Sequence, residues 1–220
     1  MREKAIVSWS GGKDSALALY EVAAEYEIVA LLTTVTSGYD RISMHGVRTR
    51  LLEQQAEALN YPLDPVLIPP RCTNDGYEDR MRAVLTRHRA VGVSRVICGD
   101  IFLEDVRRYR EERLFSEGFT GVFPLWKRDS RELAHRFIAL GFRAVLCCID
   151  THVLEERFAG RVYDETLLAD FPAAIDPCGE NGEFHTFVFA GPNFTRPLPY
   201  SLGEYTLREK RFGYRDLLPV

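Results

Sequence analysis

The sequence of 220 residues carries a formal net charge of −4 at neutral pH, and 46% of its residues are hydrophobic. Its length is sufficient for one α/β domain with a small appendage. The charge balance argues against a nucleic-acid partner, and no apolar run reaches the roughly 20 residues that a membrane-spanning helix needs. Five cysteines without regular spacing, and a first strand so close to the N-terminus that no signal peptide fits before it, predict a cytoplasmic protein.

Strands and helices are expected to alternate along most of the chain. Short apolar runs bounded by turn residues predict strands, and longer runs with apolar residues at helical spacing predict helices. The expected strands are 5–9, 28–35, 64–68, 95–100, 120–123 and 144–149, and the expected helices are 16–24, 47–59, 77–91, 104–117 and 131–140. This alternation is typical of a doubly wound parallel α/β sheet, which binds ligands at the carboxyl ends of its strands.

The composition changes near residue 170. From residue 171 to 199 the chain carries several prolines and glycines, and helical periodicity is lost. Residues 184–189 alternate as a strand does, and residues 201–208 are expected to pair back as another strand. We therefore expect an α/β nucleotide-binding domain over residues 1–170 and a small β-rich subdomain over residues 171–220 that closes the site.

Residues 10–15, with the sequence Ser-Gly-Gly-Lys-Asp-Ser, join the first expected strand to the first expected helix. Gly11 and Gly12 allow a tight turn and leave no Cβ between the backbone amides and a ligand. The N–H groups and the positive dipole end of the new helix point into the same gap. Lys13 adds a cation, and Ser10 and Ser15 add hydroxyl groups. The loop therefore predicts a phosphate-binding site.

Asp14 is a carboxylate in a place that should bind an anion. Its presence is explained if it holds a magnesium ion that the phosphates share. The alternative is an ordinary glycine turn capped by Asp14 or Ser15. Three further positions, Ser8, Thr33 and Gly99, stand at the carboxyl ends of expected strands, where we expect them to contact the nucleotide.

Two other segments carry candidate site residues. Asp100 follows the strand end at Gly99, where it would lie beside the nucleotide or its metal; the alternative is a helix N-cap. His45 and Arg48 precede the second helix and are candidates to contact the nucleotide and a phosphate, respectively. For His45 the alternative is a loop histidine exposed to water.

A second polar cluster occupies residues 176–186, which we call the acidic block. It holds three acids, an amide and a histidine within a loop that is too polar for a core and leads into an alternating strand. We expect it to act on the acceptor side of a reaction, through the candidate catalytic residues Glu180, Asn181, Glu183 and His185. The alternative is an exposed hairpin turn with scattered charge.

The cysteines do not form a recognisable site. Cys147 and Cys148 are adjacent in an expected strand, so their side chains point to opposite faces. With Cys98 they are expected to be buried structural residues. Cys72 and Cys178 lie in loops and are the two candidates for a reactive thiol. The absence of a Cys-x-x-Cys spacing argues against a zinc site and against sulfur transfer.

Several blocks of the sequence, in order along nearly the whole chain, resemble those of a known family. The Ser-Gly-Gly-Lys-Asp-Ser loop resembles the PP-loop of the ATP pyrophosphatases. The Gly-Glu-Asn-Gly-Glu-Phe-His-Thr stretch is more specific, and resembles the diphthine–ammonia ligase family within that superfamily. The blocks that carry the resemblance are residues 10–15, 99–101, 124–126, 179–186 and 191–194.

The resemblance implies a parallel, Rossmann-like nucleotide-binding sheet and a ligase that uses ATP and Mg²⁺. ATP would adenylate the carboxylate of diphthine, a modified histidine of the translocating elongation factor, and ammonia would displace AMP to give diphthamide. Lys13, a catalytic residue in this scheme, would hold the β and γ phosphates together with the loop amides, and Asp14 would help to hold magnesium. Asp100 would also act in catalysis, and the acidic block would line the ammonia or acceptor side.

One departure from the family pattern leaves the acceptor open. The best-known eukaryotic and archaeal members end the block with a Glu-Tyr-Glu-Thr-like sequence, where residues 183–186 read Glu-Phe-His-Thr. The family also has bacterial relatives, which would use another acceptor, a small-molecule carboxylate or an RNA. A non-catalytic ATP sensor and a sulfur-transferring transfer-RNA enzyme are the remaining alternatives. The oligomeric state stays open, with a homodimer as one alternative.

Overall fold

Two β-sheets organise the chain in this computed structural model, which describes residues 2–38, 41–42, 46–70 and 72–220. The first sheet has the strand order β3-β2-β1-β5-β6, with β4 also paired to β2. Its strands are β1 (Lys4–Ser8), β2 (Glu27–Thr36), β3 (Arg41–Ile42), β4 (Leu63–Ile68), β5 (Val93–Ile97) and β6 (Thr120–Val122). All pairings are parallel except that of the short β3, as a doubly wound fold requires.

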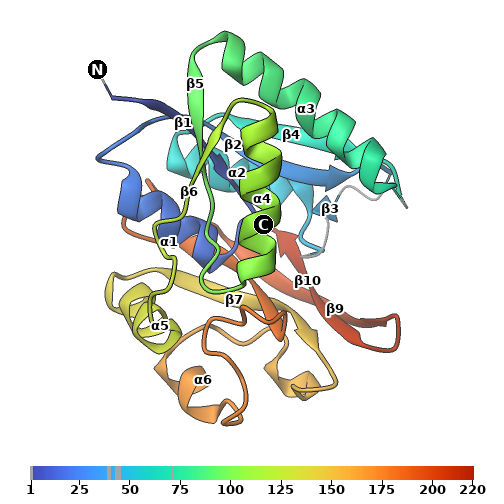
Figure 1. Cartoon of the computed structure of the whole chain (residues 1–220). Helices are drawn as coiled ribbons and strands as arrows, with labels where there is room; N and C mark the ends of the chain where they lie inside the picture. Colours follow the sequence, from blue (N-terminus) through green and yellow to red (C-terminus); the bar gives the residue numbers. More distant parts are fainter. Residues whose placement is uncertain (1, 39–40, 43–45, 71) are drawn as a thin grey trace.

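Helices cover both faces of this first sheet (Figure 1). They are α1 (Lys13–Val22), α2 (Thr49–Leu59), α3 (Asn74–Ala90) and α4 (Glu104–Ser116). Alternation along β1 shows the two layers: Ala5 and Val7 pack in the larger core with α1 and α2, whereas Ile6 packs in a smaller core with α3. The predicted α/β class is therefore confirmed.

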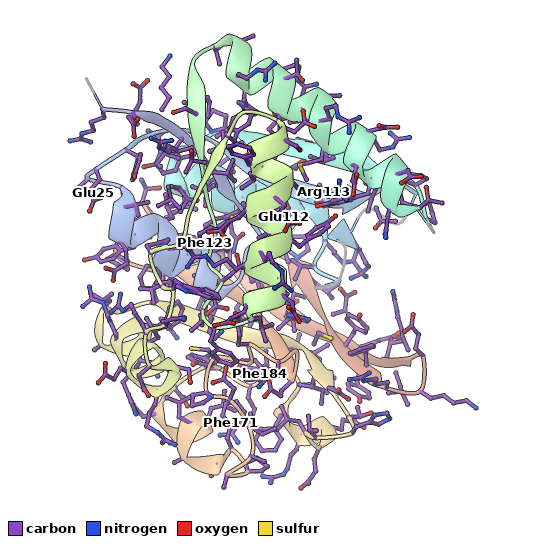
Figure 2. The ribbon with its side chains drawn as sticks, viewed as in Figure 1. Glu25, Glu112, Arg113, Phe123, Phe171 and Phe184 are labelled. Carbon is purple, nitrogen blue, oxygen red and sulfur yellow. The ribbon has the colours of Figure 1, made fainter. Side chains whose placement is uncertain are left out.

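The second sheet is antiparallel and has the order β8-β7-β10-β9. Its strands are β7 (Arg143–Asp150), β8 (Phe184–Ala190), β9 (Tyr200–Arg208) and β10 (Phe212–Pro219), accompanied by α5 (Ser130–Ala139), η1 (Glu156–Phe158) and α6 (Glu165–Asp170). Aromatic side chains fill its core, where Phe171 and Phe184 stack with ring centroids 5.2 Å apart (Figure 2). The small β-rich C-terminal part is thus present.

Strand β7 corrects one expectation. Residues 144–149 were expected to extend the parallel sheet, but β7 pairs antiparallel with β8 and β10. All residues of β7 except the first are buried, and a strand buried on both faces has the same continuous apolar sequence in either kind of sheet. The two sheets consequently divide between β6 and β7, well before residue 170.

The larger core is continuous from α1 and α2 to β7 and β8. The second sheet therefore packs on the first as part of one structure. No helix in the described part of the chain is long and apolar enough to cross a membrane.

Candidate active site

The PP-loop is built by its two glycines. Gly11 has a φ of +77°, and a Cβ at this position would lie 2.8 Å from atoms of the Leu52 and Gln55 side chains. Gly12 is the N-cap residue of α1 and makes no side-chain cap. Helix α1 begins at Lys13, three residues earlier than expected, so Lys13, Asp14 and Ser15 form its first turn. The turn is therefore not capped by the Asp14 or Ser15 side chain.

Gln55 holds the loop against the second sheet, a role that the sequence analysis missed. This side chain is fully buried in α2, and its Nε2 donates to the carbonyl oxygens of Gly11 (2.9 Å) and Val188 (2.6 Å). Its Oε1 accepts from Trp9 Nε1 at 3.1 Å. A glutamine on the apolar face of a predicted helix indicated this role, because a buried polar side chain needs hydrogen-bond partners.

Lys13 is buried, with a side chain only 3% exposed. Its Nζ donates to both carboxylate oxygens of Asp14 at 2.8 Å and to the carbonyl oxygen of Cys178 in the acidic block. It lies 5.5 Å from the ring centroid of Phe184. Burial alone would lower the pKa of Lys13, but the neighbouring Asp14 charge and hydrogen bond outweigh this and raise it. Lys13 therefore stays charged at neutral pH.

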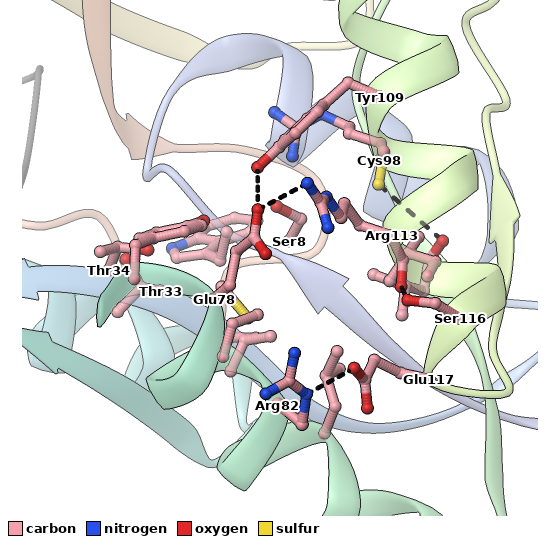
Figure 3. Close-up of a pocket in the computed structure, with 18 of the residues that line it drawn as sticks. Ser8, Thr33, Thr34, Glu78, Arg82, Cys98, Tyr109, Arg113, Ser116 and Glu117 are labelled. Atoms are coloured by element: carbon pink, nitrogen blue, oxygen red, sulfur yellow. Dashed lines mark hydrogen bonds and ion pairs between the residues drawn. The ribbon is translucent and has the colours of Figure 1, made fainter. Parts of the chain in front are cut away.

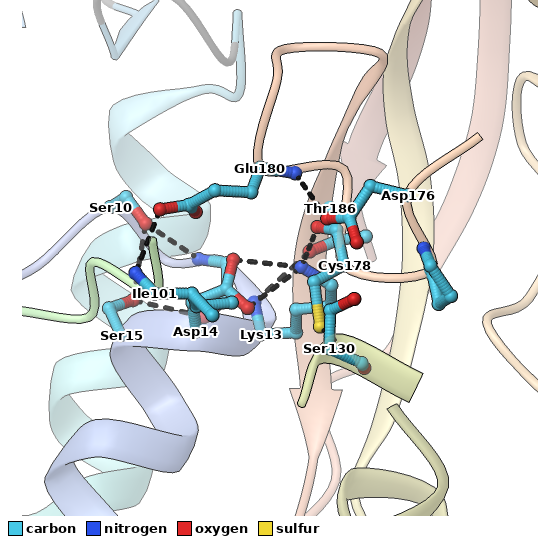
Figure 4. A network of polar contacts seen from close by, with 12 residues as sticks. Ser10, Lys13, Asp14, Ser15, Ile101, Ser130, Asp176, Cys178, Glu180 and Thr186 are labelled. Atoms are coloured by element: carbon cyan, nitrogen blue, oxygen red, sulfur yellow. Dashed lines mark hydrogen bonds and ion pairs between the residues drawn. The ribbon is translucent and has the colours of Figure 1, made fainter. Parts of the chain in front are cut away.

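The acidic block meets the PP-loop and the end of β5 (Figure 4). The Glu180 carboxylate accepts from the backbone N–H of Ile101 at 2.8 Å and of Phe102 at 3.3 Å. On the other side of the loop, the backbone N–H of Lys13 donates to Thr186 Oγ1 at 3.0 Å. Residues that are far apart in sequence thus form one network of polar contacts.

Glu183 organises the acidic block from within. Its side chain is 7% exposed, and Oε1 accepts from the backbone N–H of Asp176 (3.1 Å) and from Asn181 Nδ2 (3.0 Å). Its Oε2 is buried and has no hydrogen-bond partner among the described residues. An exposed turn with scattered charge would not bury a carboxylate in this way.

His185 follows on β8, where burial lowers its pKa to about 4, with a contribution from the charge of Lys13. This side chain is therefore neutral at physiological pH. Thr186, the next residue, accepts a hydrogen bond from the PP-loop. The sequence analysis did not single out Thr186, although it ends the block that carried the family resemblance.

A cavity of about 370 Å³ opens beside the loop, between the strand ends and the helices α3 and α4 (Figure 3). Ser8, Ser10 and Thr33 line it, as expected for the carboxyl ends of β1 and β2. Thr33 Oγ1 is buried without a hydrogen-bond partner in the described chain. The cavity also reaches Glu78 of α3, which pairs with Arg113 of α4 at 2.9 Å.

Gly99 and Asp100 have different surroundings from each other. A Cβ on Gly99 would lie 2.8 Å from the carbonyl carbon of Asp14, so glycine lets the end of β5 approach the first turn of α1. Asp100 does not cap α4, whose N-cap residue is Leu103. Instead Asp100 Oδ1 accepts from Arg110 Nε at 3.0 Å, and Arg110 lines the cavity.

The remaining candidates lie away from this network or outside the described chain. His45 falls in the segment 43–45, outside the described residues. Arg48 pairs with Asp216 at 2.7 Å, which explains its charge without a phosphate.

Four of the five cysteines are buried, and Cys72 is partly exposed. All five are free thiols. Burial raises the pKa of Cys98 and of Cys148 to about 12, and also raises that of Cys178. Cys178 Sγ donates to the Ser130 carbonyl at 3.2 Å. No cluster of three or more histidine, cysteine or acidic side chains suited to a metal ion occurs among the described residues.

Comparison with known proteins places the chain in a family. Residues 3–118 match the family model of the diphthamide synthase N-terminal domain, and residues 129–214 match that of the diphthamide synthase C-terminal domain. The boundary between the two matches agrees with the division between the two sheets.

Relatives from three organisms illustrate the match. Proteins named diphthine–ammonia ligase from Bos taurus and Homo sapiens are each 26% identical over 90% of this chain and 82% of theirs. The relative of the same name from Schizosaccharomyces pombe is 28% identical over 85% of this chain but only 34% of its own length.

Among solved structures, a predicted subunit of tRNA methyltransferase from Methanocaldococcus jannaschii is 17% identical, with a TM-score of 0.43 over 72% of this chain and 90% of that one.

Because the two family models together span residues 3–214 with a short gap, the chain belongs to the diphthamide synthase family, that of the diphthine–ammonia ligases.

Proposed function

We propose that this chain is an ATP-dependent carbon–nitrogen ligase that activates a carboxylate by adenylation and then transfers ammonia to it. In the first step a carboxylate oxygen attacks the α-phosphorus of ATP, and pyrophosphate leaves. In the second step ammonia attacks the acyl carbon, and AMP leaves with the carboxylate oxygen. The proposed acceptor is diphthine on the translocating elongation factor, in keeping with the names of the relatives.

One observation carries this proposal. The acidic block reaches the PP-loop and the end of β5 at the same place, through Glu180 on Ile101 and Thr186 on Lys13. A nucleotide sensor needs a phosphate loop and a base pocket, but it does not need a second cluster of carboxylates against them. An enzyme that must handle an acceptor and ammonia does need such a cluster.

The ATP half of the site is assigned to the loop and the cavity. The N–H groups of the first turn of α1 and the Lys13 ammonium would bind the β and γ phosphates and stabilise the departing pyrophosphate. The cavity of about 370 Å³ lined by Ser8, Ser10 and Thr33 would take the nucleoside. This volume lies within the usual range for a ligand pocket.

Asp14 fits a magnesium site of the kind found in nucleotide-dependent enzymes. Its carboxylate is 32% exposed and pairs with Lys13. Mg²⁺ commonly uses one or two carboxylates, with phosphates and water as its other ligands, so a cluster of protein ligands is not required. When bound, the ion would neutralise charge on the phosphates.

The acceptor half of the site is assigned to the acidic block. Glu183 Oε2, buried without a hydrogen-bond partner among the described residues, offers an acceptor for the N–H groups of ammonium. Because His185 is neutral, it would not repel ammonium. We further propose that Glu180, Asn181 and Asp100 keep the two halves in register, because Glu180 bonds to the strand end and Asn181 to Glu183.

Product analysis tests the proposal. Purified protein is incubated with ATP, magnesium, ammonium and a diphthine-bearing elongation factor, and the nucleotides are separated. We expect AMP and pyrophosphate, and loss of both with Lys13→Ala. Lys4→Ala is the matched control, because Lys4 is the first residue of β1, at the end of that strand far from the PP-loop. Formation of ADP would contradict the proposal, and AMP formed only with another carboxylate would keep the chemistry but change the acceptor.

A further inference from the structure

A second cavity, of about 390 Å³, lies where β9 and β10 approach Arg41 and residues 46–48. Four arginines line it, Arg41, Arg48, Arg208 and Arg215, against two carboxylates, those of Glu204 and Asp216. We call this cavity the arginine groove. It concentrates positive charge in a protein whose overall formal charge is −4.

The four guanidinium groups are held in two different ways. Arg41 and Arg48 both bind the Asp216 carboxylate, at distances between 2.7 and 3.3 Å. Arg208 instead lies 5.2 Å from the ring centroid of Tyr214, and Arg215 lies 5.5 Å from that of Tyr205. Neither Arg208 nor Arg215 has an ion pair within the described part of the chain, and Arg215 Nε is buried without a hydrogen-bond partner there.

The wall of the groove is an edge strand. Strand β9 ends the order of the second sheet, so one of its backbone edges pairs with β10 and the other pairs with no described strand. Thr206 pairs with Tyr214 in the sheet, which places Thr206 and Arg208 on the same face of the sheet as Tyr214. Arg215 pairs with Tyr205 and therefore lies on the other face. Leu202 and Leu207 of the same strand are 52% and 51% exposed. In Figure 1 the β9–β10 hairpin projects from the body of the molecule.

The groove lies next to the candidate active site. Cys147 lines it and donates through Sγ to the carbonyl oxygen of His185 at 3.4 Å. The following residue, Thr186, accepts the hydrogen bond from the PP-loop. A molecule held in the groove would thus contact β7, the strand that pairs with β8.

We propose that the arginine groove and the open edge of β9 bind an extended, acidic segment of a protein acceptor. Carboxylates on one face of the segment would bind Arg208, and its backbone would add to the β9 edge. Apolar side chains on the other face of the segment would cover Leu202 and Leu207. The inference rests on the proposed function in so far as the acceptor is a protein. Arginines also attract RNA, but a strand edge with exposed leucines favours a polypeptide.

Fluorescence anisotropy tests this docking site directly. The probe is a labelled peptide of alternating glutamate and valine, compared with a glutamine–valine peptide and a uridine oligonucleotide of equal length. We expect wild-type protein to bind the acidic peptide about tenfold more tightly than the neutral one, with salt weakening the binding. Arg208→Ala should remove about fivefold of affinity.

Two controls make the result interpretable. Arg157 and Arg196 are exposed and do not line the groove, so replacing both by alanine should leave affinity within about twofold. Glu204 is exposed, so Glu204→Gln should not affect folding. The change removes a negative charge from the groove and should tighten binding of the acidic peptide about twofold.

Equal affinity for the acidic and neutral peptides, or undiminished binding by Arg208→Ala, would overturn the proposal, and so would tighter binding of the oligonucleotide. AMP formation is measured separately. If wild-type protein forms AMP but shows no preference for the acidic peptide, the proposed docking site is wrong and the proposed function stands.

Discussion

The backbone N–H of Lys13 donates a 3.0 Å hydrogen bond to Thr186 Oγ1, although 173 residues separate the two along the chain. Lys13 begins the first helix of the parallel sheet, and Thr186 lies in an edge strand of the antiparallel sheet. A second bond, from the Val188 N–H to the Gly11 carbonyl at 2.9 Å, runs beside it. The position of the PP-loop therefore depends on the C-terminal sheet, and each sheet supplies part of the candidate site.

Removing the hydroxyl of Thr186 should impair the loop. Thr186→Val keeps the shape of the side chain but leaves the buried amide of Lys13 without its acceptor, which costs about 1–3 kcal/mol. We expect AMP formation to fall about tenfold. Thr186→Ser restores the hydroxyl and should stay within about twofold of wild type. Wild-type rates for the valine variant would show that this contact does not position the loop.

We expect Gln55 to affect the free energy of unfolding more than the rate of either reaction step. Gln55→Leu would leave Trp9 Nε1 and the carbonyl oxygens of Gly11 and Val188 without their buried partner. We expect the free energy of unfolding to fall by about 3 kcal/mol in a urea titration. Glu53→Leu on the exposed side of the same helix is the control, with a change of about 0.5 kcal/mol or less. Equal losses for the two variants would contradict the role of Gln55.

Local signals were enough to predict the first sheet and its loop. The glycine pair, the helix after it and the buried strands each depend on neighbours in sequence, and their bounds agree with the structure within a few residues. Asp129 caps α5, accepting from the Glu132 N–H at 2.9 Å, and aspartate is a common N-cap residue. The acidic block was identified as a candidate site because five polar residues stood together where helical periodicity had ended.

Contacts between distant segments could not be predicted in this way. The apolar sequence of β7 fits either type of buried strand, so its place in the second sheet follows from pairing with β8 and β10. Strand β10 was missed because Gly213, Arg215 and Asp216 break any regular alternation. Asp216 in turn attracts Arg41 and Arg48 from the other sheet. Asp216 lies 168 residues from Arg48 in the sequence, so the residues around Arg48 give no indication of this ion pair.

Asp216 should link the two sheets in a pH-dependent manner. Burial alone would raise its pKa, but hydrogen bonds from Arg41 and Arg48 outweigh this and lower the pKa to about 2. Because the folded pKa lies below the unfolded value, the stabilisation is complete above about pH 4 and is lost as the pH falls towards 2. We expect Asp216→Asn to cost about 2 kcal/mol at pH 7.

Urea titrations of wild type and Asp216→Asn at several pH values provide the measurement. The difference between the two proteins should shrink as the pH is lowered from about 4 to about 2. A constant difference over this range would show that the carboxylate charge is not the source of the effect.

His185 should remain neutral throughout the physiological range. Its pKa is lowered to about 4, first by burial and then by the charge of Lys13. The unfolded chain therefore binds a proton between about pH 6.5 and pH 4 that the folded chain does not, so stability falls as the pH decreases through this window.

The titration of His185 can be followed by NMR of the histidine ring protons, with His185→Gln used to assign the signal. We expect a midpoint near pH 4 for His185. A midpoint near the ordinary value of about 6.5 would place a charged imidazole beside Lys13 and exclude the neutral role proposed here.

The two halves of the site should separate in kinetics. Glu183→Gln removes the carboxylate charge but keeps the shape, so we expect slower amide formation with ATP affinity within about twofold of wild type. Lys13→Ala should instead lose ATP affinity. Isothermal titration with a non-hydrolysable ATP analogue gives the affinities. Loss of ATP binding by Glu183→Gln in proportion to activity would move Glu183 to the nucleotide side.

Isotope transfer tests adenylation most directly. A diphthine-bearing elongation factor whose diphthine carboxylate is labelled with oxygen-18 is incubated with the protein, ATP, magnesium and ammonium, and the AMP formed is analysed by mass spectrometry. Because the carboxylate oxygen that attacks the α-phosphorus leaves with AMP, we predict AMP that carries one labelled oxygen. AMP without label, or ADP as the product, would contradict the account.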